Sequence, residues 1–239
     1  MQAIMESIFD VGYLVTVIIL GIRMIRRAPG PTTGKGRVGL LFGVMTVILG
    51  CGDAFHLVPR IAALWTDGFV TLAVPLGIGK LVTSITMTFF YVLLYRVWQM
   101  HYADAARGGS ASGTGTAYPG GVLSPIIYIL AAARIILCLF PQNQWIRTDA
   151  PLSWGIYRNI PFVILGLIIV VVFAVKGGAM KKAGRNDPFR FMWLAITLSF
   201  AFYIPVVLWA DVYPLIGMLM LPKTCAYVWI VVMGYKGLR

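Results

Sequence analysis

The stretch IPFVILGLIIVVVFAV at residues 160–175 decides the fold class. It contains no charged residue, and Lys176 follows it directly. With its flanks, this run approaches the length of about 20 mostly apolar residues that a transmembrane helix needs. A helix satisfies every backbone polar group within its own segment, which lipid requires. The stretch therefore predicts a membrane-spanning helix.

Six further apolar runs occur along the chain. The seven predicted spans lie at 8–25, 38–58, 76–98, 122–140, 160–175, 191–210 and 213–235. We therefore predict one all-α domain over residues 1–239, a polytopic membrane protein with seven transmembrane helices. The stretch 103–121 is rich in Gly, Ser and Thr and is predicted to be a flexible cytoplasmic loop.

The composition excludes other classes of protein. Hydrophobic residues make up 59% of the chain and charged residues 12%, and the mean hydropathy is +0.86. Average soluble domains have about 25% charged residues, and disordered chains have low hydrophobicity. The three cysteines each lie in an apolar run, without the spacing of a disulfide framework or a metal site. No metal site is predicted.

The distribution of Lys and Arg predicts the orientation. Most of the 20 basic residues lie in the first, third and fifth connections and in the C-terminal tail. Because basic loops stay in the cytoplasm, the N-terminus is predicted outside and the C-terminus in the cytoplasm. The net charge of +12 then reflects topology and contact with anionic lipids, and nucleic-acid binding is not expected.

Ionisable residues inside the predicted spans or at their ends are candidates for a functional site, since charge at membrane depth is unfavourable. The candidates are Asp53, His56, Arg60, Lys80, Arg134, Arg158, Asp211 and Lys223. In the predicted orientation they lie between the middle of the membrane and the outer surface. Helical spacing adds Ser84, Tyr203 and Tyr227 to the same polar faces.

The predicted site has a surplus of positive charge, because its Lys and Arg outnumber Asp53 and Asp211. This surplus predicts a pocket for an anionic small molecule or lipid head group in a transporter or receptor-like protein. Lys80, Arg134 and Lys223 would attract the anion. Asp53 and His56 would adjust the charge or relay a proton.

Two other classes of function remain open at this stage. In a membrane-embedded lipid-modifying enzyme, Asp53 and His56 would form an acid–base pair. In a structural subunit, the same charges would only fix helix packing, for example through an Asp53–Arg60 or Asp53–Lys223 pair. Oligomeric state and soluble partners are not predicted.

The last predicted span suggests a further alternative. The sequence LPKTCAYVWIVVMGYKGLR at 221–239 is similar to the last helix of animal opsins, which implies a retinal Schiff base at Lys223. The third span lacks both the acidic-arginine signature of those receptors and the carboxylate pattern of microbial opsins. No other cofactor is predicted.

Four stretches carry a broader resemblance. They are GDAFHLVPR at 52–60, GKLVTSITM at 79–87, PLSWGIYRNIP at 151–161 and PKTCAYVW at 222–229. In these the chain resembles a family of bacterial, mainly clostridial-type, membrane proteins that have no assigned activity. The resemblance implies seven helices in a bacterial cytoplasmic membrane and supplies no function.

Overall fold

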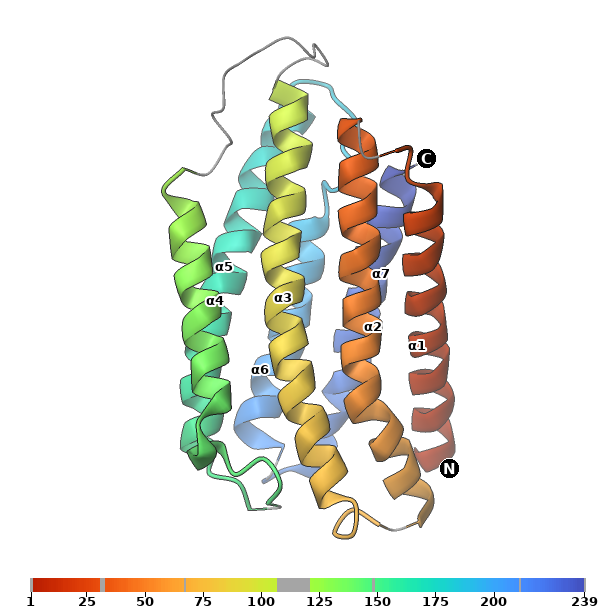
Figure 1. The fold of residues 1–239 in the computed structure, drawn as a ribbon, viewed down its shortest axis with the longest axis vertical. Helices are drawn as coiled ribbons and strands as arrows, with labels where there is room; N and C mark the ends of the chain where they lie inside the picture. Colours follow the sequence, from red (N-terminus) through yellow and green to blue (C-terminus); the bar gives the residue numbers. More distant parts are fainter. Residues whose placement is uncertain are drawn as a thin grey trace.

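The computed structural model describes residues 2–30, 33–66, 68–106, 121–147, 149–210 and 212–238, and these residues form helices without strands. The long helices run alternately up and down the bundle (Figure 1). Their bounds are α1 Gln2–Arg27, α2 Gly34–Thr66, α3 Ala73–Ala106, α4 Leu123–Leu139, α5 Leu152–Lys182, α6 Met192–Trp209 and α7 Met220–Gly237. Two short 3-10 helices, η1 Pro141–Asn143 and η2 Pro214–Leu219, precede α5 and α7.

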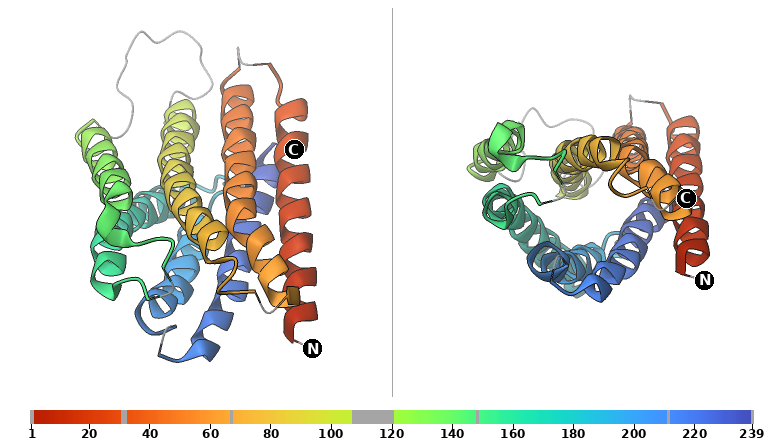
Figure 2. Two further views of the ribbon diagram at one scale, coloured as in Figure 1. Left: turned by 60° about the horizontal axis from the view of Figure 1, so that its bottom comes forward. Right: turned by 90° about the horizontal axis from the view of Figure 1, so that it is seen from below.

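Helices that are consecutive in the sequence pack side by side. Each of α1 to α6 contacts the next helix, and α7 contacts both α1 and α2. The end view in Figure 2 shows the resulting closed ring of helices. The N-terminus lies at the lower end of the bundle in Figure 1 and the C-terminus at the upper end.

The outer surface of the bundle is apolar. On α1 the exposed side chains recur every three or four residues, at Ile4, Ile8, Val11, Val15 and Ile19. On α5 they are Ile160, Ile164, Leu167, Val171 and Val175. A water-soluble bundle would place polar residues on these faces. The exposed apolar faces therefore match a lipid environment, as expected for a multi-pass membrane protein.

Six helices of the described residues are long and apolar enough to cross a membrane. The remaining apolar helix, α4, has 17 residues and lies at the lower limit of about 17–25 residues for a span. The predicted run 213–235 divides into η2 and α7, and α3 continues well past residue 98. Most of the predicted loop 103–121 lies outside the described residues.

The upper half of the interior is filled with aromatic side chains. Tyr95 of α3 is fully buried, and Trp98 donates a hydrogen bond to the carbonyl of Val172 at 3.1 Å. Aromatic rings bury large areas and pack edge to face with their neighbours. This half of the bundle is therefore closed.

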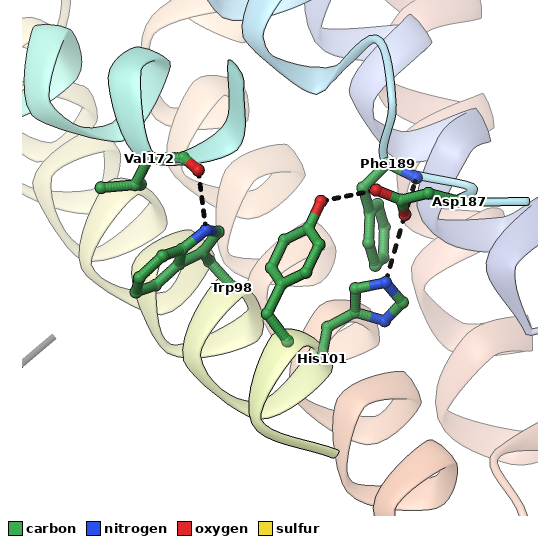
Figure 3. A network of polar contacts seen from close by, with 6 residues as sticks. Trp98, His101, Val172, Asp187 and Phe189 are labelled. Carbon is green, nitrogen blue, oxygen red and sulfur yellow. Dashed lines mark hydrogen bonds and ion pairs between the residues drawn. The ribbon is translucent and has the colours of Figure 1, made fainter. Parts of the chain in front are cut away.

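A carboxylate clamp joins α3 to the α5–α6 connection at the upper end (Figure 3). Asp187 accepts hydrogen bonds from Tyr102 at 2.6 Å and from the backbone N–H of Phe189 at 2.9 Å. His101 Nε2 lies 3.1 Å from the same carboxylate. The clamp fixes the end of α3, beyond the apolar run predicted from sequence.

Candidate functional site

A small cavity lies in the lower half of the bundle between α1, α2, α7 and η2. Its volume is about 70 Å³, enough for a small group of water molecules or a small ion. The charged and titratable side chains that line it are Glu6, Asp10, Asp53, His56, Arg60, Lys223 and Tyr227. The cavity thus brings together Asp53, His56, Arg60, Lys223 and Tyr227 of the residues predicted from sequence.

Two polar contacts connect α1 with α2 at this cavity. Arg60 Nη2 lies 2.9 Å from Glu6 Oε2, and the Glu6 side chain is 8% exposed. Tyr13, which is buried, donates a hydrogen bond of 2.5 Å to Asp53. Each contact places a carboxylate against a strong donor, so both hold the helices in register.

The other polar groups of the cavity are less well satisfied. Asp10 is 6% exposed and accepts no hydrogen bond from the described residues. His56 Nδ1 is buried and also lacks a partner within the described part of the chain. The Lys223 ammonium lies 4.8 Å from the centre of the Tyr203 ring and 5.3 Å from that of Tyr227. These groups leave donors and acceptors for water or a ligand in the cavity.

The charge of the lining differs from the predicted surplus of cations. The cavity has three carboxyl side chains, Glu6, Asp10 and Asp53, but two basic side chains, Arg60 and Lys223. With these five groups ionised and His56 neutral, the lining has an excess of one negative charge.

The remaining predicted arginines lie apart from this cavity, near the lower end of α4. Arg134 is 2% exposed, and its guanidinium carbon lies 3.3 Å from the centre of the Phe162 ring. Arg158 donates to Asn143 at 2.9 Å and lies over the Trp145 ring. The predicted cluster is therefore divided into two groups.

Tyr203 lies between the two groups. Its hydroxyl donates to Asn159 at 3.0 Å, and its ring faces Lys223. The Phe162 and Tyr203 rings meet edge to face, with centres 6.2 Å apart. Arg134 and Lys223 are thus linked through two aromatic rings.

Three predicted site residues are not part of either group. Lys80 is exposed on α3 and does not line the cavity. Ser84 donates back to the carbonyl of Lys80 at 2.8 Å. Asp211 lies outside the described residues.

Sequence reasoning missed Glu6, Asp10 and Tyr13, because these residues lie just before or near the start of the first predicted span, at 8–25. The three residues are spaced i, i+4 and i+7, as in the polar faces recognised on other spans. That spacing was the available signal.

The geometry also bears on catalysis and cofactors. Asp53 accepts a hydrogen bond from Tyr13, and no hydrogen bond joins it to His56 within the described residues. Lys223 lines this cavity of about 70 Å³. Among the described residues, no group of three or more His, Cys, Asp or Glu side chains is arranged to hold a metal ion.

Comparison with known proteins adds no assignment. No protein family, no curated protein and no solved structure matches the chain. The fold and its apolar surface define a multi-pass integral membrane protein.

Proposed function

We propose that the protein is a transporter or receptor-like membrane protein whose lower cavity binds one monovalent cation, a proton or an alkali ion. The excess of one carboxylate in the cavity lining carries this proposal. An uncompensated charge at membrane depth is strongly unfavourable, so a bound cation balances it. Chains of acidic and His side chains in membranes commonly serve ion and proton pathways.

The position of the cavity supports a role in ligand exchange. It lies in the half of the bundle that contains the N-terminus, while aromatic residues close the other half. Asp10 supplies the free acceptor, and Asp53 and His56 lie on the facing helix. Binding of the cation at Asp10 would neutralise the cavity without breaking the Glu6–Arg60 or Tyr13–Asp53 contacts.

Replacement of Asp10 tests the cation site. In nanodiscs of neutral lipid, the melting temperature of the protein is expected to rise by several degrees when Na⁺ or K⁺ is added, if the cation is an alkali ion. If the cation is a proton, the melting temperature should rise by a similar amount as the pH is lowered from 8 to 6. Asp10→Asn should remove this dependence because it removes the excess charge. The exposed Asp149→Asn should keep it. A melting temperature independent of both cations and pH in the natural protein, or the same dependence in Asp10→Asn, contradicts the proposal and supports a structural role.

We also propose that the protein crosses a bacterial cytoplasmic membrane seven times, with its N-terminus outside. The basic clusters at the first and fifth connections lie at the upper end of the bundle, and would contact anionic lipids of the cytoplasmic leaflet. The lower end, with the cavity, then faces outward.

Chemical labelling tests this orientation. In a chain with its three cysteines replaced by alanine, Gln142→Cys at the lower end should react with a membrane-impermeant maleimide on intact cells. Lys35→Cys at the upper end should react only after the cells are broken. The opposite labelling pattern would mean that the N-terminus lies in the cytoplasm. Labelling of both sites on intact cells would contradict the proposed topology, because the two ends of the bundle would then face the same side.

A further inference from the structure

Arg134 is a buried cation that hydrogen-bonds to the Cys138 side chain and keeps two donor atoms without acceptors. The residue is 2% exposed, and its Nε and Nη1 atoms have no hydrogen-bond partner among the described residues. An arginine stays charged in a protein, and a buried N–H without an acceptor is destabilising. The contact with Phe162 covers one face of the guanidinium and offers no acceptor to the N–H groups at its edge.

The neighbouring polar groups are already used elsewhere. Asn143 donates to the carbonyls of Leu137, Cys138 and Phe140 at the end of α4, and its own oxygen accepts from Arg158. The carbonyl of Cys138 also accepts from Trp145. These carbonyls therefore have donors other than Arg134.

Asn159 is also occupied. Its oxygen accepts from Tyr203, and its nitrogen donates to the carbonyl of Gly155 at 2.8 Å. The groups that interact electrostatically with Arg134 include Tyr91, Tyr203, Cys138, Tyr227, Arg158 and Lys223, and none of these is a carboxylate. The surroundings of Arg134 thus combine positive charge, hydroxyl groups and aromatic rings.

From this geometry we infer that Arg134 is the centre of a binding site for a small monovalent anion, such as a halide or a short carboxylate. The anion accepts hydrogen bonds from the edge of the guanidinium. Arg158 and Lys223 add attraction, and the Tyr203 hydroxyl lies within the same cluster. The site is separate from the cation cavity, and Lys223 and Tyr227 lie between the two.

The anion site is tested by thermal unfolding of the full chain in neutral-lipid nanodiscs. Chloride or acetate is titrated against gluconate at constant Na⁺ and ionic strength, with gluconate serving as an anion too large for a buried site. The melting temperature of the natural protein should rise saturably by several degrees with chloride, acetate or both. A rise with chloride indicates a halide site, and a rise with acetate indicates a carboxylate site. The absence of a rise with either anion overturns the inference.

Variants assign the effect to Arg134. Arg134→Met should abolish the rise, whereas the exposed Arg147→Gln should retain it. Persistence of the rise in Arg134→Met overturns the inference. If Arg134→Met does not fold, Arg134→Lys serves as the second variant. The lysine keeps the positive charge but lacks the planar guanidinium, so the apparent affinity for the anion should fall about tenfold. An unchanged affinity for the anion contradicts the site. The dependence on Na⁺ or pH assigned to Asp10 should survive in these variants, so the two proposals fail separately.

Discussion

Gly79→Ala is expected to destabilise the protein by about 3 kcal/mol and to lower its melting temperature by roughly 6–12 °C. A Cβ atom at this position would lie 2.2 Å from the carbonyl oxygen of Phe55 and 2.7 Å from the Cα of His56. Both are backbone atoms of α2, so a side-chain rotation cannot relieve the overlap. The α2–α3 contact beside the cavity must open instead.

Gly12→Ala provides the matched control. Gly12 lies within α1, and a Cβ atom there meets nothing within 4 Å. Because glycine is unfavourable inside a helix, this change should leave the melting temperature unchanged or raise it slightly. Equal stability of the Gly79→Ala and Gly12→Ala proteins in nanodiscs would show that α2 and α3 do not pack as described.

Asp187→Asn is expected to cause a loss of similar size, about 3 kcal/mol at pH 7, because the clamp loses a charged acceptor. The Asp187 side chain is 1% exposed, and its oxygens meet His101, Tyr102 and the backbone N–H of Phe189. An asparagine would turn an NH₂ group toward at least one of these donors. Thermal unfolding at pH 7 measures the effect, with Asp149→Asn as the exposed control.

The same carboxylate predicts a pH dependence. Burial alone would raise the pKa of Asp187, but hydrogen bonds from His101, Tyr102 and the Phe189 N–H outweigh it and hold the pKa below its ordinary value of 3.8. The pKa is therefore lower in the folded than in the unfolded protein. The stabilisation is complete above pH 5 and is lost as the pH falls below about 3.8 through the lowered pKa. A stability difference between natural and Asp187→Asn protein that stays constant down to pH 3 would contradict the clamp.

The helices were largely predictable because a spanning segment must be long and apolar. Residues 160–175, for example, lie within α5 as expected. The end of α3 was missed because hydropathy falls after Trp98, while backbone hydrogen bonding continues to Ala106. Asp187, which lies far away in the sequence, holds that polar end through its contacts with His101 and Tyr102.

The site was predictable in part. The unfavourable energy of buried charge drew attention to Asp53, His56, Arg60 and Lys223, and the structure places these four around one cavity. The same argument places all charges together, yet Arg134 lies on α4 and packs on Phe162 instead. Helical spacing within one span does not show which other helix its polar face contacts. The order of the helices in the ring determines that contact.

The most direct test of the central claim is to count the cation. Purified protein in neutral-lipid nanodiscs is equilibrated with radiolabelled Na⁺ at pH 8, and proton uptake is measured in parallel as the pH is lowered to 6. We predict one bound monovalent cation per chain, as Na⁺ or as a proton, and none in Asp10→Asn. Binding of neither ion to the natural protein, or equal binding to the Asp10→Asn variant, would contradict a cation site in the cavity.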